Sequence, residues 1–307
     1  MDKRLCLKMY IFVVSSIITT MSANETAILE SEFIYPLGKK PTPQCHASTI
    51  VQTTKGTLMC AWFGGTKEGN SDVSIWISRF KNKQWTSPIK VADGIQYTTT
   101  DGKEIRYPCW NPVLFQPTKS PLILFYKVGK SPESWWGMLM TSDDDGKTWH
   151  SPTRLPEGII GPVKNKPIEL QDGRILCGSS TEDNGWTVHF EYTYDYGKTF
   201  KRTPPINNTN EISSIQPCFL KHPDGTIQSL GRSAQGKIWQ CFSTNNGDSW
   251  TKMNLTTLPN PNSGIDAVTL RDGKHILVYN HTKKGRSPLN IAVSEDGKHW
   301  SAGPVRR

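Results

Sequence analysis

Ser142-Asp-Asp-Asp-Gly-Lys-Thr-Trp149 is the fullest copy of a turn motif that returns along this chain. Later copies end at Phe200, Trp250 and Trp300, and a degenerate copy ends at Trp85. The closing aromatic residues are 64, 51, 50 and 50 residues apart. A repeat of about 50 residues built from short strands is typical of a β-propeller, in which each repeat forms one blade.

Each repeat also carries signals for four strands. Tight turns between first and second strands are expected at Lys55-Gly56, Asp172-Gly173, Asp224-Gly225 and Asp272-Gly273, since Asp-Gly between apolar alternations is a strong hairpin signal. Second strands are expected at 57–63, 174–178, 226–230 and 274–279, and the second repeat has strand patterns at 112–115, 122–128 and 137–141. The chain is therefore predicted to be all-β, a six-bladed β-propeller with five blades visible and the sixth incomplete.

The polar residue at the third position of the motif recurs in every full copy, whereas a catalytic group is needed only once. A short carboxylate or amide side chain in a turn accepts hydrogen bonds from nearby backbone amides. We therefore interpret these residues as structural: Asp144, Asp195, Asn245 and Asp296.

Successive loops of an up-and-down blade alternate between the two faces of the propeller. The Asp-Gly turns and the motif turns share one face, so the entries to the first strands and the loops between second and third strands share the other. That second face collects nine candidate site residues: His46, Glu68, Asp72, Trp110, Lys164, Lys166, Gln216, Arg232 and Arg286. Cations, carboxylates and aromatic rings gathered at one end of a propeller predict a binding site for an acidic sugar.

Residues 1–23 have the pattern of a secretory signal peptide, with basic residues, then an apolar stretch from Met9 to Met21, then small residues. The apolar stretch is short for a membrane span, so no stable span is expected after cleavage. Residues 24–44 are expected to be an N-terminal extension that contributes to the closing blade, and residues 45–307 to be the propeller.

Four glycosylation sequons agree with export, at Asn24, Asn207, Asn254 and Asn280. Together with the leader they predict a secreted or lysosomal glycoprotein, expected to be a monomer.

The formal net charge of +9 favours anionic partners. The basic residues are scattered, which favours an acidic glycan over nucleic acid. Six cysteines follow the leader without a C-x-x-C pair, so both disulfides and free thiols remain open, and a zinc site is not expected. Neither a metal cluster nor a glycine-rich phosphate loop is evident, so no metal and no cofactor are predicted.

Five segments carry a more specific resemblance than the repeat alone: Cys45-His-Ala-Ser-Thr49, Ala61-Trp-Phe-Gly-Gly-Thr-Lys-Glu-Gly69, Trp110-Asn-Pro112, Gly161-Pro-Val-Lys-Asn-Lys-Pro167 and Pro259-Asn-Pro-Asn-Ser-Gly264. On these segments and the repeat, the chain resembles the sialidase (neuraminidase) superfamily and its secreted branch of BNR-repeat proteins. The resemblance covers about residues 42–307. It implies an exo-α-sialidase that releases terminal sialic acid from glycoconjugates.

Members of that family hold the substrate carboxylate with three arginines. The resemblance places the second and third at Arg232 and Arg286, while His46 stands where the first would be. Arginine suits this role because its planar fork matches a carboxylate. Lys164, Lys166 and Trp110 are expected to contact the same substrate.

Family members also use an aspartate as acid/base and a tyrosine, assisted by a glutamate, as nucleophile. The resemblance offers Asp72 and Glu68 for the acid/base, and it places Gln216 where the assisting carboxylate would be. The tyrosine belongs to a segment after the fifth motif, and this chain ends at Arg307. We therefore expect a C-terminally truncated product.

Two further functions remain open. Because histidine is a natural general base, His46 suits a hydrolase or lyase acting on uronic-acid glycans. Without the tyrosine-bearing segment, the chain is also compatible with a catalytically inactive propeller that only binds glycans.

Overall fold

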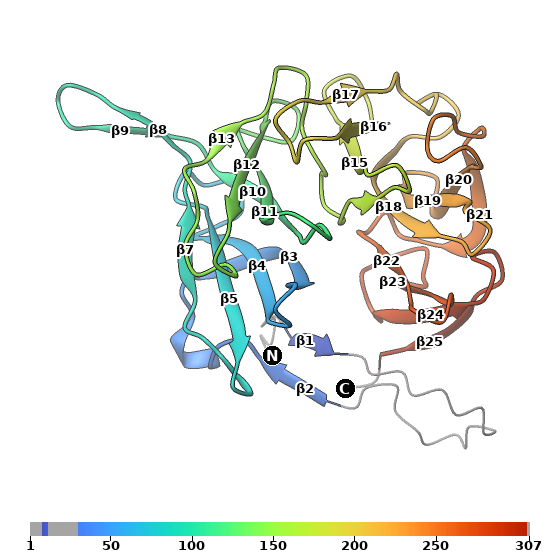
Figure 1. The fold of residues 1–307 in the computed structure, drawn as a ribbon, viewed down its shortest axis with the longest axis horizontal. Helices are drawn as coiled ribbons and strands as arrows, with labels where there is room; N and C mark the ends of the chain where they lie inside the picture. Colours follow the sequence, from blue (N-terminus) through green and yellow to red (C-terminus); the bar gives the residue numbers. More distant parts are fainter. Residues whose placement is uncertain (1–7, 12–29, 306–307) are drawn as a thin grey trace.

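The computed structural model describes residues 8–11 and 30–305, and these residues form almost exclusively β-structure. Five antiparallel sheets stand around a common centre (Figure 1). Each sheet is built from strands that follow one another in the chain, so the topology is up-and-down throughout. The predicted all-β propeller with five visible blades is confirmed.

The blades are numbered in chain order, and the first strand of each lies nearest the centre (Figure 1). Blade I contains β3 (Gln44–Gln52), β4 (Leu58–Gly65), β5 (Ser74–Lys81) and β6 (Gln84–Trp85), with β7 (Ile89–Ala92) also paired to β5. Blade II contains β10 (Cys109–Phe115), β11 (Leu122–Val128), β12 (Trp136–Ser142) and β13 (Thr153–Arg154). Blade III contains β14 (Ile168–Glu169), β15 (Ile175–Thr181), β16 (Thr187–Thr193) and β17 (Lys201–Arg202). Blade IV contains β18 (Ser214–Lys221), β19 (Ile227–Ser233), β20 (Lys237–Ser243) and β21 (Asn254–Pro259). Blade V contains β22 (Asp266–Thr269), β23 (His275–Tyr279), β24 (Asn290–Ser294) and β25 (Ser301–Pro304).

A separate two-stranded sheet is formed by β1 (Lys8–Ile11) and β2 (Glu30–Phe33), and Figure 1 shows it between blade V and blade I. A short 3₁₀ helix, η1 (Leu37–Lys39), leads from it into blade I. The Trp85 indole donates to Glu32 Oε1 at 3.1 Å, which ties this segment to blade I. Within residues 8–11 and 30–305 no sixth four-stranded blade is formed, and the role of residues 24–44 in closing the ring stays a prediction. The rest of the predicted leader and Asn24 lie outside the described residues.

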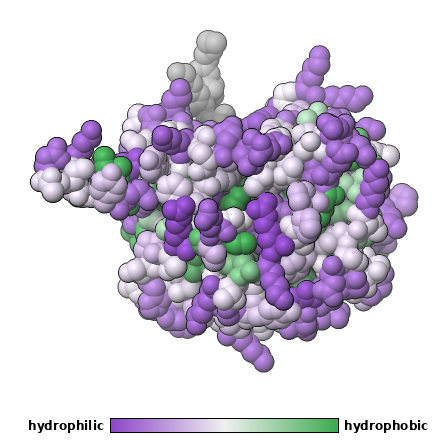
Figure 2. Space-filling model, turned by 90° about the horizontal axis from the view of Figure 1, so that it is seen from above, coloured by the Kyte–Doolittle hydropathy of each residue, from purple (hydrophilic) through white to green (hydrophobic). Residues whose placement is uncertain are grey.

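A hairpin of β8 (Ile95–Thr98) and β9 (Glu104–Arg106) projects from the ring as an arm (Figures 1 and 2). Its turn contains Gly102 at φ 82°, a conformation that glycine adopts without strain. The surface around it in Figure 2 is mainly hydrophilic, with small apolar patches. None of the helices in the described part of the chain is long and apolar enough to cross a membrane. The six described cysteines are free thiols, and all except Cys45 are buried.

The motif turns are structural, as their repetition predicts. In blade II the Asp144 carboxylate accepts hydrogen bonds from the Thr148 amide at 2.9 Å, the Thr148 hydroxyl at 2.7 Å and the Lys147 amide at 3.0 Å. The bond from the Thr148 amide is the main reason why the pKa of Asp144 lies well below its ordinary value. In blade IV Asn245 Oδ1 accepts from the Ser249 amide at 2.9 Å in the same way. The side-chain oxygen therefore organises each turn.

We expect Asp144→Asn to be tolerated near neutral pH and Asp144→Ala to lower the denaturation midpoint, because only alanine removes the acceptor that Asn245 still provides in blade IV. A carboxyl whose folded pKa is depressed stabilises the fold above its unfolded pKa and loses that contribution as the pH falls. The wild type should therefore lose stability below about pH 4, and Asp144→Asn should lose less. Thermal denaturation of the wild type, Asp144→Asn and Asp144→Ala near neutral pH and below about pH 4 measures these differences. An equal loss of stability at low pH in the wild type and Asp144→Asn would contradict the prediction.

The closing aromatic of each motif packs into the core between blades. The Trp250 ring lies 4.3 Å from the Phe190 ring of blade III and 6.1 Å from the Phe219 ring. Its indole nitrogen donates to the Gly247 carbonyl at 3.0 Å, so the turn and the core are joined by one side chain. Aromatic pairs in such tilted arrangements contribute to stability beyond the area they bury.

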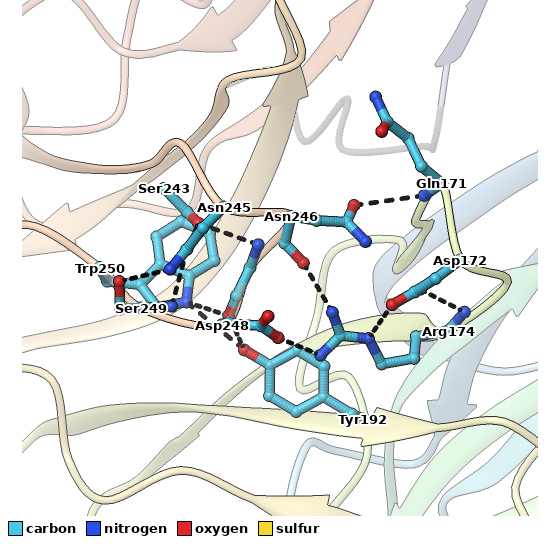
Figure 3. Close-up of polar contacts among 11 residues, drawn as sticks. Gln171, Asp172, Arg174, Tyr192, Ser243, Asn245, Asn246, Asp248, Ser249 and Trp250 are labelled. Atoms are coloured by element: carbon cyan, nitrogen blue, oxygen red, sulfur yellow. Dashed lines mark hydrogen bonds and ion pairs between the residues drawn. The ribbon is translucent and has the colours of Figure 1, made fainter.

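Polar contacts also join the motif turns of blades II, IV and V to the blade before each of them. Figure 3 shows Arg174 of blade III between its own turn residue Asp172 at 2.7 Å and Asp248 of the blade IV motif at 2.6 Å. Arg174 also donates to the Asn246 carbonyl at 3.0 Å. In blade I, Arg79 binds the Asp145 carboxylate of the blade II motif at 2.8 Å. These contacts fix the angle between neighbouring blades.

Replacing Arg174 by alanine should lower the free energy of unfolding by about 2 kcal/mol, because hydrogen bonds to charged groups are lost at a largely buried guanidinium. Lys274 occupies the same position after the blade V turn, and its amine is 3.7 Å from Asp272 at a more exposed site. The Lys274→Ala control should change the free energy by less than about 0.5 kcal/mol. Denaturant titration compares the two, and equal losses would argue against a bond between blades.

Candidate functional site

The same backbone irregularity occurs in the central strands of blades I, II and IV. In β3, β10 and β18 two residues lie opposite one residue of the next strand, as a β-bulge. Ala47, Asn111 and Gln216 stand at its equivalent position with φ values of 52°, 35° and 58°. Left-handed conformations are unfavourable for residues with a side chain, and such strain concentrates at functional sites. His46 and Trp110 stand directly before the bulges of β3 and β10, and Gln216 stands within the bulge of β18.

Arg232 is the centre of a polar cluster formed by blades III, IV and V. It lies half-buried in β19, where Nε donates to Asn262 Oδ1 at 2.8 Å and Nη1 donates to Gln216 Oε1 at 3.3 Å. Its guanidinium carbon lies 5.3 Å from the centre of the Trp186 ring. Both hydrogen bonds go to neutral amides, so the protein orients this cation without pairing it with a carboxylate through these bonds.

Arg286 adds a second positive charge. It is exposed in the loop between β23 and β24. Burial lowers the pKa of Arg232, the charge of Arg286 lowers it further, and the charge of Glu182 opposes both. Two guanidiniums close enough to repel one another form a site that an incoming anion would stabilise. The structure thus brings together Arg232, Arg286 and Gln216, three of the residues that the sequence predicted.

Glu182 is the member of this cluster that the sequence did not select. It lies half-buried in the loop between β15 and β16, four residues before Trp186. Burial raises the pKa of Glu182, and the negative charge of Glu133 raises it further, although Arg232 and a hydrogen bond from Trp186 pull it down. A carboxyl whose pKa is raised can act as a general acid.

The two lysines of the cluster have protein partners. Lys164 Nζ donates to Asn165 Oδ1 at 2.9 Å and to the Ile265 carbonyl at 3.0 Å. Lys166 Nζ lies 3.4 Å from Asp266 Oδ2. Burial lowers the pKa of Lys164. Both amines therefore connect blade III to blade V near the centre, and they present less free charge to a ligand than the arginines do.

His46 and Glu68 form a second pair, in blade I. His46 Nε2 lies 4.0 Å from Glu68 Oε2, and the two side chains are 45% and 50% exposed. The His46 ring stacks on Phe63 with 5.6 Å between ring centres. An exposed imidazole held by an aromatic ring and a carboxylate is available for proton transfer.

Two other residues that the sequence predicted, Trp110 and Asp72, are held by contacts within the protein. Trp110 is 7% exposed, its indole nitrogen donates to the Gly129 carbonyl at 2.9 Å, and its ring contacts Phe63 and Trp135. It therefore offers little open ring surface to a sugar. Asp72 Oδ2 accepts from the Thr66 hydroxyl at 2.6 Å and from the Thr66 amide at 2.8 Å. The bond from the hydroxyl is the main reason why the pKa of Asp72 is lowered, which suits an ionised group better than a proton donor.

The described sequons differ in access. Asn254 is exposed. Asn207 uses its amide within a loop, where it donates to the Trp186 and Ile212 carbonyls and accepts from the Val188 amide. Asn280 is 5% exposed and donates to the Pro288 carbonyl. The Asn254 amide donates to the Lys252 carbonyl at 2.9 Å at an exposed position, whereas a glycan at Asn207 or Asn280 would displace bonds of more enclosed side chains.

The repeated blades, the motif turns and the polar cluster at the centre define a β-propeller of the sialidase type. The chain belongs to the BNR repeat-like domain family, whose sequence profile matches residues 56–305. A curated sialidase from Bacteroides fragilis (strain YCH46) is 24% identical over an alignment of 181 residues, and the match covers 52% of this chain and 32% of the relative. The chain thus spans about a third of the length of that relative.

Solved structures share the fold at low identity. The NanB sialidase from Streptococcus pneumoniae superposes with a TM-score of 0.71 at 14% identity, over 90% of this chain and 63% of that chain. A leech intramolecular trans-sialidase gives the same four values. A protein of unknown function from Dyadobacter fermentans DSM 18053 has a TM-score of 0.68 at 17% identity, over 85% and 83% of the two chains. The sialidase superfamily assignment implied by the sequence segments is confirmed.

Proposed function

We propose that this protein is a secreted, exo-acting glycosidase-like protein and that its activity is that of an exo-α-sialidase. The observation that carries the proposal is the Arg232–Arg286 pair beside Glu182, a carboxyl whose pKa burial raises. Two cations and a carboxyl with a raised pKa match a substrate with an acidic group next to a glycosidic bond. The names of the similar proteins, a sialidase and a trans-sialidase among them, support the same substrate class.

In this proposal the residues of the cluster have separate tasks. The carboxylate of the terminal sugar docks between the two guanidiniums, where the fork of Arg232 is already oriented by Asn262 and Gln216. The Trp186 ring packs against the sugar edge. Glu182 donates its proton to the glycosidic oxygen as the bond from that oxygen to the anomeric carbon breaks, so the second sugar leaves as a neutral alcohol. A water molecule forms the new bond to the anomeric carbon and gives its proton to the solvent, which releases free sialic acid.

Release of sialic acid from a fluorogenic sialoside tests this proposal, with a fluorogenic β-glucuronide as the matched substrate. We expect fluorescence from the sialoside and binding of free sialic acid in titration calorimetry. Binding of sialic acid without release would support the alternative of a glycan-binding propeller. Neither release nor binding would overturn the proposal.

A second function is favoured by the His46–Glu68 pair. Histidine in place of the first arginine, 4.0 Å from a carboxylate, suits a base that abstracts a proton from a uronic-acid ring. Such an elimination yields an unsaturated sugar that absorbs in the ultraviolet. Growth of this absorbance with a uronic-acid polymer, and its loss in His46→Ala, would assign the lyase activity. Retained activity in His46→Ala would exclude His46 as the base.

A further inference from the structure

The bulge of β18 lies directly beside Arg232. The register of β18 shifts between Ile215, which pairs with Arg232, and Cys218. Gln216 lies inside this shift at φ 58°, in the left-handed region that is unfavourable for a residue with a side chain. Arg232 Nη1 donates to Gln216 Oε1 at 3.3 Å. The orientation of the guanidinium therefore depends on a backbone conformation that glutamine rarely adopts.

Two buried side chains of blade III hold Gln216 at both ends of its backbone. The Gln216 amide donates to Ser180 Oγ at 3.2 Å, and the Gln216 carbonyl accepts from Asn165 Nδ2 at 3.0 Å. Asn165 Nδ2 also donates to the Pro217 carbonyl at 3.2 Å. Ser180 and Asn165 are 1% and 2% exposed. We call these two side chains the blade III clamp.

The Asn165 amide has one orientation that satisfies all its neighbours. A carbonyl oxygen only accepts hydrogen bonds, so the NH₂ group of Asn165 must face the Gln216 and Pro217 carbonyls. Asn165 Oδ1 then faces Lys164 Nζ, which donates to it at 2.9 Å. An aspartate at this position would bring a carboxylate oxygen against two carbonyl oxygens, so the clamp requires the amide.

The clamp is specific to the blade that carries the arginine. In the described part of the chain, no side chain bonds the amide or carbonyl of Ala47 or Asn111, which stand at the equivalent position in blades I and II. Blade III also approaches the bulge of β18 closely. A Cβ on Gly178 of β15 would lie 2.9 Å from the Pro217 carbonyl oxygen, so glycine allows this approach.

We propose that Asn165 and Ser180 are positioning residues for Arg232, which they orient through the backbone of Gln216. Without the clamp, Gln216 can return to negative φ and its side chain leaves Nη1. Arg232 then keeps only the bond from Nε to Asn262. A guanidinium that must be ordered when a ligand binds gives a lower affinity than one that is already ordered. The effect on affinity rests on the proposed function, whereas the effect on the guanidinium does not.

Side-chain NMR of ¹⁵N-arginine-labelled protein tests the positioning without a ligand, with the Arg232 signals assigned by their loss in Arg232→Lys. In the wild type the two Nη groups of Arg232 should give separate signals, because the bond to Gln216 slows rotation about the Nε–Cζ bond. In Asn165→Ala and Ser180→Ala the two signals should merge. Separate signals in both variants, or merged signals in the wild type, would overturn the inference.

Gln228→Ala is the matched control. Gln228 is a fully buried amide of β19, the strand of Arg232, and it donates to the Gly297 carbonyl of blade V at 2.9 Å. Its loss should leave the two Arg232 signals separate, whereas merging in this variant as well would show a general loosening and overturn the inference. Asn165→Asp keeps the size of the side chain, should also merge the signals, and replaces Asn165→Ala if that variant does not fold.

Binding and turnover separate this inference from the proposed function. In Asn165→Ala the affinity for sialic acid in titration calorimetry should fall about tenfold, which corresponds to about 1.4 kcal/mol. KM for the fluorogenic sialoside should rise by a similar factor while kcat stays within about twofold, because the carboxylate is held equally before and during the reaction. If the wild type binds no sialic acid but the NMR pattern is as expected, the positioning stands and the sialidase proposal fails. If the wild type and Asn165→Ala bind sialic acid equally, the positioning inference is overturned and the sialidase proposal stands.

Discussion

Glu182→Gln should lower kcat for sialoside cleavage by about 10²- to 10⁴-fold, the range that general acid catalysis contributes. Glutamine keeps the size of the side chain and its hydrogen bond with Trp186, but it has no proton to give to the leaving oxygen. Binding of free sialic acid should persist, because the Arg232 and Arg286 guanidiniums are unchanged. A loss of binding as large as the loss of turnover would show that Glu182 acts on the site's structure.

The pH profile gives Glu182 a second test. Burial raises the pKa of Glu182, so the carboxyl stays protonated above the ordinary glutamate range of about 4.3. Because the acid must be protonated, the activity of the wild type should fall as the pH rises through this raised pKa. The residual activity of Glu182→Gln should not show this fall. Glu68→Gln and Asp72→Asn are the matched controls, since the sequence offered both as acids. A larger loss in either of them would reassign the role.

Arg232→Ala should weaken sialic acid binding by about 30- to 1000-fold, equal to about 2–4 kcal/mol for a partly buried charged hydrogen bond that is lost. Arg232→Lys should recover only part of this, because an ammonium cannot match both carboxylate oxygens in one plane. Titration calorimetry measures both. Arg271→Ala is the control, an exposed arginine in the turn between β22 and β23 on the opposite face. Unchanged affinity in Arg232→Ala would remove the carboxylate site.

The regular part of the fold follows from local sequence. Asp224-Gly225 forms a turn with Gly225 at φ 86°, and in the motif that ends at Trp250 the Ser243 and Asn245 side chains accept from backbone amides of the same motif. The arm of β8 and β9 has the same kind of signal in Asp101-Gly102. The repeat does not predict this hairpin, because it is an insertion between the motifs that end at Trp85 and Trp149. These two motifs are 64 residues apart, whereas the later ones are about 50 residues apart.

The candidate site was predictable only in part. Arg232 and Arg286 follow from their positions after the turns of blades IV and V, and the structure brings them together. The repeat places Glu182 on the same face, but its raised pKa could not be predicted, because that pKa depends on burial and on Glu133 and Arg232, which lie in other blades. Trp110 looked like a platform, yet its packing between Phe63 and Trp135 depends on contacts that no local pattern records.

The contacts of Lys164 and Lys166 make some blades of the ring harder to open locally than others. Motif contacts join blades II, IV and V to the blade before each of them, but Lys164 and Lys166 of blade III also reach Ile265 and Asp266 of blade V. Blade IV is thus enclosed by partners that are bonded to each other, while blades I and II have no such brace among the described residues. The free energy of local opening rises with the number of contacts that must break. Hydrogen exchange should therefore be slowest in β18 and β19 and faster in β3 and β4, and the reverse order would show that the lysines are not a brace.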